Sequence, residues 1–185
     1  MRYFCIKNIL FVFVFIASIY ILSNVASAAT AAEIERNVKS ALEKLYSEFP
    51  LAKTLGEKAK GILVFPSIVK GGFIVGGQYG EGALLKAGKT VGYYNTVQAS
   101  YGLQAGLQKY GYALFLMTDS AVKYLDKSGG WEIGVGPTIT IVDKGLMGSA
   151  TSTTLKSEIY AFFFSQKGLM AGLGLQGTKI TKMKK

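Results

Sequence analysis

The sequence predicts an α+β fold: a curved, mostly antiparallel, glycine-rich sheet with an N-terminal amphipathic helix and one or two further short helices. All 23 glycines fall between Gly56 and Gly177, so a helical N-terminal part gives way to strands and turns. Beyond Gly61, short apolar or alternating runs bounded by turn residues recur along the chain. From these runs we expect about nine strands and three helices.

Residues 1–28 are predicted to be a signal peptide rather than part of the fold. Basic residues precede an apolar run over residues 9–22, and the small residues at 26–28 suit a signal peptidase. We expect cleavage between Ala28 and Ala29, and an uncleaved anchor is the alternative. The protein is therefore expected to be exported to the periplasm or the cell surface, where it would be peripheral on a membrane.

Residues 29–60 are predicted to form an N-terminal helical segment. Apolar residues recur there at spacings of three and four, which is typical of an amphipathic helix, and this helix should end at Pro50. The apolar stripe consists of Ile34, Val38, Leu42, Leu45 and Phe49. Because glutamates outnumber basic residues on this helix, we expect the stripe to pack on the sheet, with a membrane-facing stripe as the alternative. A second short helix is expected over residues 51–60.

Residues 61–178 are predicted to form the β-rich part of the same domain. The first strand, over residues 62–65, is expected to stop at Pro66, because proline lacks the N–H that a strand ladder uses. The next two strands, 72–79 and 81–86, are expected to pair as a hairpin with a glycine at the bend.

The remaining elements follow from similar patterns. Further strands are expected over residues 90–94, 98–107, 112–117, 131–142, 148–154, 158–165 and 169–175. A helix over residues 120–127 is expected to be capped by Thr118 or Asp119. Residues 179–185 are expected to form a basic tail.

The composition excludes several catalytic classes. The chain has no histidine, so it cannot hold a Ser-His-Asp or Cys-His site, a histidine-ligated zinc or a histidine general base. We therefore predict no catalytic residue, no metal site and no cofactor. The remote alternative is a hydrolase that uses Ser67 and Lys70, which have Ser-x-x-Lys spacing. The Gly-x-Gly-x-x-Gly pattern at 172–177 lacks the following helix that a dinucleotide site requires.

The basic balance of the chain favours an anionic partner. There are 21 Lys and Arg against 11 Asp and Glu, which gives a formal net charge of +10. Such a charge suits phospholipid head groups, and export makes nucleic acid an unexpected partner. The candidate lipid-binding residues are Lys53, Lys58, Lys60, Lys70, Lys179, Lys182, Lys184 and Lys185. Each lysine near an anionic leaflet can contribute ~1 kcal/mol, provided that the lysines share one face.

Several segments resemble the SYLF-domain family, a lipid-binding group whose eukaryotic relatives include actin-patch regulators. Three segments of this chain resemble the opening of the family's domain: Ala-Lys-Gly-Ile-Leu-Val-Phe-Pro at 59–66, Lys-Gly-Gly-Phe-Ile-Val-Gly-Gly at 70–77 and Gly-Glu-Gly at 80–82. Later segments that look like family blocks are 100–106, 115–122, 134–137, 165–172 and 175–177. Tyr93 and Tyr94 stand where many members carry a tryptophan.

The resemblance implies a noncatalytic, membrane-binding module, with a phosphoinositide preference described for eukaryotic relatives. This chain looks like a bacterial exported member, so actin is not expected as a partner. The leading hypothesis is reversible binding to anionic phospholipid membranes. The alternative is a structural or adaptor protein of the envelope that presents a sheet edge or glycine-rich face to a protein partner.

Overall fold

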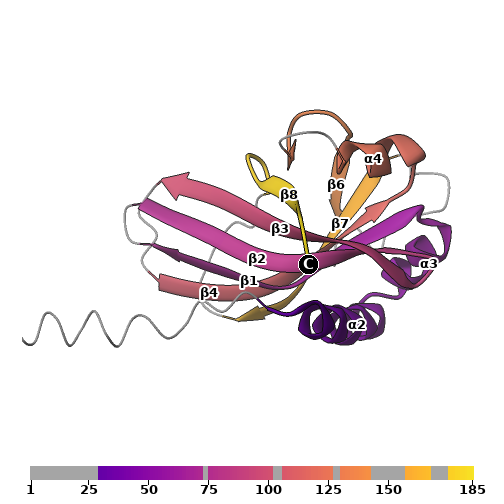
Figure 1. Cartoon of the computed structure of the whole chain (residues 1–185), viewed down its shortest axis with the longest axis horizontal. Helices are drawn as coiled ribbons and strands as arrows, with labels where there is room; N and C mark the ends of the chain where they lie inside the picture. Colours follow the sequence, from indigo (N-terminus) through magenta and orange to yellow (C-terminus); the bar gives the residue numbers. More distant parts are fainter. Residues whose placement is uncertain (1–28, 73–74, 102–105, 127–129, 143–156, 168–174) are drawn as a thin grey trace, which may run out of the picture.

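The computed structural model describes residues 29–72, 75–101, 106–126, 130–142, 157–167 and 175–185. Within them, eight strands form one curled sheet with the order β5-β8-β3-β2-β1-β4-β7-β6, and only β6 and β7 pair in parallel (Figure 1). The elements are α2 (Ala31–Glu48), α3 (Pro50–Lys58), β1 (Gly61–Gly72), β2 (Val75–Lys86), β3 (Lys89–Tyr101), β4 (Gly106–Leu116), α4 (Asp119–Tyr124), β5 (Trp131–Glu132), β6 (Ile139–Val142), β7 (Ile159–Lys167) and β8 (Lys179–Met183). The predicted α+β class is confirmed.

Capping residues and a proline explain where α2, α3 and α4 begin. Thr30 caps α2 in a capping box: its hydroxyl accepts from the Glu33 N–H, and the Glu33 carboxylate accepts from the Thr30 N–H at 2.8 Å. Pro50 starts α3 at a position where a missing N–H costs nothing. Thr118 caps α4, as predicted. Within the described ranges, no helix is both long and apolar enough to cross a bilayer.

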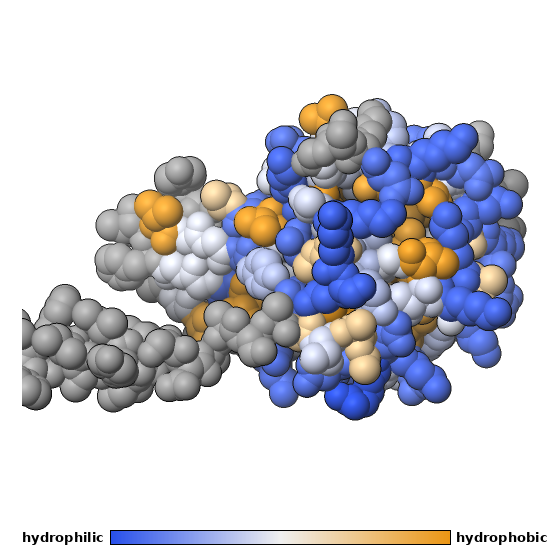
Figure 2. Space-filling model, viewed as in Figure 1, coloured by the Kyte–Doolittle hydropathy of each residue, from blue (hydrophilic) through white to orange (hydrophobic). Residues whose placement is uncertain are grey.

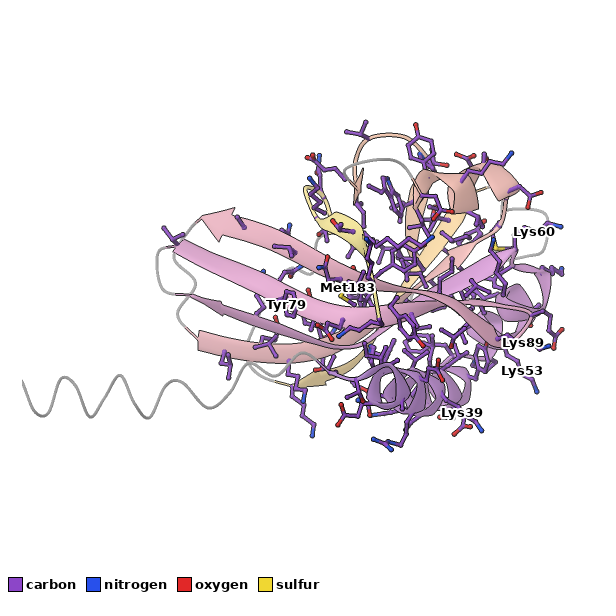
Figure 3. The ribbon with its side chains drawn as sticks, viewed as in Figure 1. Lys39, Lys53, Lys60, Tyr79, Lys89 and Met183 are labelled. Carbon is purple, nitrogen blue, oxygen red and sulfur yellow. The ribbon has the colours of Figure 1, made fainter. Side chains whose placement is uncertain are left out.

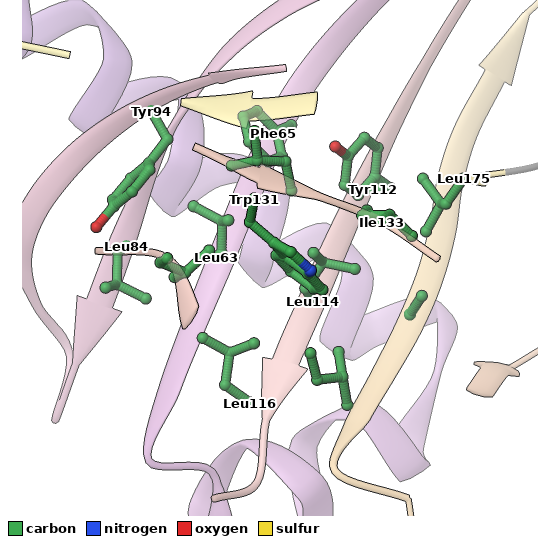
Figure 4. Packing of buried hydrophobic residues seen from close by; sticks show 14 of the residues in the cluster. Leu63, Phe65, Leu84, Tyr94, Tyr112, Leu114, Leu116, Trp131, Ile133 and Leu175 are labelled. Carbon is green, nitrogen blue, oxygen red and sulfur yellow. The ribbon is translucent and has the colours of Figure 1, made fainter. Parts of the chain in front are cut away.

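The sheet buries side chains on both faces. On the face covered by α2 and α3, called here the helix face, the core residues of β1 are Ile62 and Val64. On the opposite face, Leu63 and Phe65 pack with α4 and Trp131 (Figure 4). Burial on both sides explains why residues 62–65 form a continuous apolar run instead of an alternating one.

The helix-face cluster uses the predicted apolar stripe. Ile34, Val38, Leu45 and Phe49 are at most 6% exposed, and Leu42 is half-buried against the same cluster. The stripe therefore packs on the sheet, as predicted from the excess of glutamates on this helix. A membrane-facing stripe is wrong for this conformation, because these side chains already form the core.

The prediction that Pro66 ends the first strand is wrong. β1 continues to Gly72, and its register with both neighbours shifts beside Pro66, which is the signature of a β-bulge. A bulge accommodates a residue that cannot donate to the ladder. The predicted hairpin of residues 72–79 and 81–86 is also wrong, because residues 75–86 form one strand, β2, and Gly80 lies inside it. A Cβ at Gly80 would lie 2.7 Å from the Ser67 carbonyl oxygen beside the bulge, which explains the glycine at this position.

The other strand predictions are partly correct. The turn between β2 and β3 is at Ala87 and Gly88, both at positive φ. The predicted strand 98–107 covers the end of β3 and the start of β4, with residues 102–105 outside the described residues. The predicted strand 131–142 is two short strands, β5 and β6. The predicted signal peptide, the strand 148–154 and residues 169–174 lie outside the described residues.

The lysine-rich end of the chain is not a loose tail. Its residues Lys179–Met183 form β8, which lies between β3 and β5 in the sheet. Ile180 is fully buried opposite Thr96 and Trp131. Ile180 packs in the cluster opposite α2 and α3, and Met183, three residues on, packs against the helix-face cluster, so this end of the chain contributes to both sides of the sheet. Both buried clusters are built from residues between Ala29 and Met183.

Candidate functional site

The lysines that the sequence singled out do not share one surface. Lys53, Lys58 and Lys60 lie on or just after α3. Figure 3 shows Lys53 and Lys60 at one end of the molecule. Lys70 lies near the far end of β1, ten residues beyond Lys60, a separation of about 30 Å along a strand. The lysines at 179–185 belong to β8 and the end of the chain.

Lys70 and Ser67 point to opposite faces of the sheet. Ser67 is paired with Glu81, whereas Lys70 is paired with Gln78, and the two pairs have opposite parity along β1 and β2. A Ser-Lys nucleophile pair needs both side chains on one side. The Ser-Lys hydrolase is therefore ruled out by the geometry of the strand.

Lys70 lies between two buried glutamines. Gln78 on β2 and Gln108 on β4 are its partners in the register, and both are nearly inaccessible to solvent. The hydroxyl of Tyr110 donates to Gln78 Oε1 at 2.6 Å. Lys70 therefore lies in a polar row on the face opposite to α2.

Two lysines near the C-terminus are already engaged within the protein. Lys182 Nζ lies 2.7 Å from Asp126 Oδ1. Lys185 Nζ lies 3.4 Å from Glu81 Oε2 and donates to the carbonyl of Ala29. These contacts connect β8 to the chain that follows α4 and connect the last residue to the start of α2, so both lysines have structural partners.

The helix face continues beyond α2 as an exposed apolar surface. Val97, Tyr79 and Val69 are directly opposite one another on β3, β2 and β1, and each is 46–48% exposed. Leu107 on β4 and Val75 on β2 extend this surface outward and are still more exposed. Together these five residues are called the apolar face. The projecting strand ends carry hydrophobic groups among pale residues, while the rest of the visible surface is mostly hydrophilic (Figure 2).

Exposed lysines lie at both ends of this surface. Lys179 on β8 is paired with Val97, and Lys109 on β4 is paired with Val69. Lys167 on β7 is in turn paired with Lys109. Lys109, Lys167 and Lys179 are called the flanking lysines. Since directly paired residues point to the same side of a sheet, the row reads Lys179, Val97, Tyr79, Val69, Lys109, Lys167 across six strands.

Tyr79 is held in place at the centre of the apolar face. Its hydroxyl donates to Glu81 Oε1 at 2.7 Å. Burial and this carboxylate together raise the pKa of Tyr79 to about 12, so the ring stays neutral at physiological pH. The Tyr79 side chain remains about half exposed.

A second concavity lies at the other end of the sheet. α2, α3 and the β2–β3 turn enclose a groove of about 1040 Å³. Four lysines line it: Lys39, Lys60, Lys86 and Lys89. Figure 3 shows Lys39, Lys60 and Lys89 together at this end and Tyr79 on the opposite arm.

The described residues contain no group of three or more Cys, Asp or Glu side chains arranged to hold a metal ion. The exposed features of the described residues are an apolar face and a basic groove. The fold and its surfaces thus define a small α+β domain with two distinct exposed surfaces.

A comparison with protein families found a match over the C-terminal part of the chain. Residues 97–185 match the model of the Ysc84 family, described as Las17-binding protein actin regulator, so this part of the chain is similar to that family. The Ysc84 family is the SYLF-domain family, so the resemblance that the sequence analysis gave is confirmed. The match runs from Val97 in β3 to the last residue and includes β8. A comparison with curated proteins found no match.

Sequence reasoning missed most residues of both surfaces. Lys39, Lys86 and Lys89 were not connected with Lys60 because a helix and a turn distant in sequence bring them together. The flanking lysines Lys109 and Lys167 were missed because their position depends on strand register. The alternation of apolar and polar residues within β3 and β4 was the available signal, but it did not reveal which strands pair.

Proposed function

We propose that this chain is an exported, noncatalytic protein that binds reversibly to anionic phospholipid membranes through the apolar face and its flanking lysines. The observation that carries the proposal is the cross-strand row in which three exposed apolar side chains lie between lysines. Contiguous exposed apolar patches mark interaction sites, whereas single exposed apolar residues do not.

The chemistry of this row matches the surface of an anionic bilayer. The exposed halves of the apolar side chains would each gain about 1 kcal/mol on leaving water. Each flanking lysine would contribute ~1 kcal/mol through the negative surface potential while its alkyl stem lies along the apolar face. Tyrosine is also a residue favoured at the boundary between lipid and water.

The position of Ala29, where the described chain starts, also supports membrane contact through the apolar face. The carbonyl of Ala29 accepts from Lys185, and Lys185 contacts Glu81, two residues from Tyr79 on the same face of β2. The predicted signal peptide therefore joins the domain beside the apolar face. In a chain that retained it, this segment would hold the apolar face toward the membrane.

The family description supports a binding role and suggests an alternative partner. It names a Las17-binding actin regulator, which is a statement about that family and not about an exported chain. An envelope protein that covers the apolar face is the second candidate, because the same surface suits an apolar interface. Salt distinguishes the two, since binding through lysines weakens with ionic strength and an apolar interface does not.

The test is cosedimentation of residues 29–185 with vesicles of phosphatidylcholine alone or mixed with phosphatidylglycerol, at low and high salt. We expect binding to the anionic vesicles that weakens as salt rises. Replacing Lys109, Lys167 and Lys179 by Gln should weaken it by at least about tenfold. Point substitutions are used because deletion of residues 179–185 would remove β8.

The matched control replaces Lys53, Lys58 and Lys123 by Gln, which removes the same charge from exposed positions elsewhere. The control should bind as the unmodified chain does. If the control loses affinity and the first variant does not, the contact lies near α3 and not at the apolar face. If neither vesicle binds the chain, a protein partner becomes the better proposal.

A further inference from the structure

The groove between α2, α3 and the β2–β3 turn combines an apolar floor with a basic rim. Its floor is formed by Leu42, Tyr46, Ala59, Ile62 and Leu85, all of which belong to or pack against the helix-face cluster. Its volume of about 1040 Å³ is at the upper end of the range for small-molecule sites.

The rim carries ammonium groups from three separate parts of the chain. Lys39 comes from α2, Lys60 follows α3, and Lys86 and Lys89 flank the β2–β3 turn. Between described residues there are three ion pairs, Lys44–Glu48, Lys182–Asp126 and Lys185–Glu81, and none uses a rim lysine.

Three glutamates also line the groove, and two of them act on neighbouring tyrosines. Glu35 accepts a hydrogen bond from the Tyr93 hydroxyl at 2.5 Å. Burial, and secondarily the charge of Glu57, raises the pKa of Tyr46. Glu43 is the third. The four rim lysines still outnumber the carboxylates, so the groove is complementary to an anion.

We propose that this groove binds one molecule of a monoacyl anionic lipid, a single alkyl chain with a phosphate head group. The alkyl chain would lie on the floor beside Leu42 and Leu85, where it leaves water. The phosphate would lie among Lys60, Lys86 and Lys89, since ammonium groups bind phosphate as point charges.

This site is separate from the proposed membrane contact. Tyr79 in the apolar face and Lys86 on the rim are seven residues apart on β2, about 23 Å along the strand. The inference therefore does not rest on membrane binding. It adds a site where the domain holds a single amphiphile.

The experiment is isothermal titration of residues 29–185 with 1-oleoyl glycerol-3-phosphate below its micelle concentration. Glycerol phosphate tests the head group alone, and 1-oleoyl glycerophosphocholine tests the chain with a neutral head. We expect one molecule bound per chain, with both comparison ligands at least about tenfold weaker. Native mass spectrometry checks the stoichiometry.

Substitutions locate the site. Lys86→Gln with Lys89→Gln changes only exposed residues at a turn, so the fold should persist, and it should weaken binding by at least about tenfold. Lys53→Gln with Lys58→Gln is the matched control outside the groove lining and should leave the affinity unchanged. The Lys86 and Lys89 variant should still bind anionic vesicles, so failure of this inference is distinguishable from failure of the proposed function.

Three results would overturn the inference. They are an absence of saturable binding, equal affinity of the Lys86 and Lys89 variant, and glycerol phosphate binding as tightly as the acylated ligand. The last result would identify a phosphate site without a role for the apolar floor.

Discussion

At the scale of single residues, Glu81 lies where the two ends of the described chain meet. Its carboxylate accepts hydrogen bonds from the Tyr79 hydroxyl and from Lys185 Nζ. The Glu81 and Lys185 side chains are 11% and 14% exposed, so this ion pair is well shielded from solvent. Lys185 also donates to the Ala29 carbonyl, which makes the last residue a link between the sheet and the start of α2.

Replacing Lys185 by Met should therefore destabilise the fold. The substitution leaves the shielded Glu81 carboxylate without its cation and the Ala29 carbonyl without its donor, a cost of about 1–3 kcal/mol. Urea unfolding followed by circular dichroism measures it. Lys184→Met is the control, because Lys184 is exposed, and its unfolding free energy should stay within about 0.5 kcal/mol of the original. Equal effects of the two substitutions would show that the contacts of Lys185 contribute nothing to the free energy of unfolding.

At the scale of elements, the β1 bulge at Pro66 determines how the sheet bends. Glycines on both neighbouring strands make room for it. A Cβ on Gly82 of β2 would lie 2.1 Å from the Val64 carbonyl oxygen, and one on Gly111 of β4 would lie 3.0 Å from the Pro66 carbonyl oxygen. The bulge also changes the parity of β1, which places Val69 on the exposed helix face.

Gly82→Ala should destabilise the domain, because the added methyl group overlaps a backbone atom that has no alternative rotamer. We expect a loss of roughly 1–3 kcal/mol in thermal or urea unfolding. Gly77→Ala is the matched control on the same strand, since its Cβ would meet nothing closer than 3.6 Å. A Gly82→Ala variant as stable as the Gly77→Ala variant would contradict the tight packing at the bulge.

The fold class followed from the sequence, whereas the candidate surfaces did not. The position of the glycines, the apolar stripe of α2 and the Thr118 cap depend on neighbours a few residues away, so local patterns reveal them. The apolar face depends on the pairing of β1, β2, β3 and β4 across long separations. A single bulge changes which side chains share a face, and the sequence of one strand does not show its partner's register.

At the scale of the whole molecule, buried tyrosines link stability to alkaline pH. Burial, and then the charge of Asp126, raises the pKa of Tyr94 to about 12. Burial also raises the pKa of Tyr110 to about 12, and it raises the pKa of Tyr112, whose hydroxyl donates to Thr96, further still. In the unfolded chain these hydroxyls ionise near pH 10.

The contribution of these tyrosines to stability should therefore be constant below about pH 10 and fall between pH 10 and 12. In that range the unfolded chain loses protons that the folded chain keeps, and each tyrosine contributes up to about 1.4 kcal/mol per pH unit. Urea titrations at pH 8 to 11.5 measure the slope, and Tyr112→Phe should reduce it. An unfolding free energy at pH 11 equal to that at pH 8 would contradict the burial of these hydroxyls.

In the proposed orientation of the whole molecule, the apolar face contacts the bilayer and the α3 end does not. The only cysteine in the sequence lies before residue 29, so residues 29–185 accept one labelled cysteine at a chosen position. We would attach a polarity-sensitive fluorophore at Leu107→Cys on the apolar face and, in a separate protein, at Thr54→Cys on α3. Both positions are exposed.

The measurement is the emission of each label, and its access to an aqueous quencher, when vesicles containing phosphatidylglycerol are added. We expect a blue shift and protection from the quencher at position 107, with position 54 unchanged. A blue shift at position 54 with none at position 107 would contradict it and place the membrane contact on the lysines of α3.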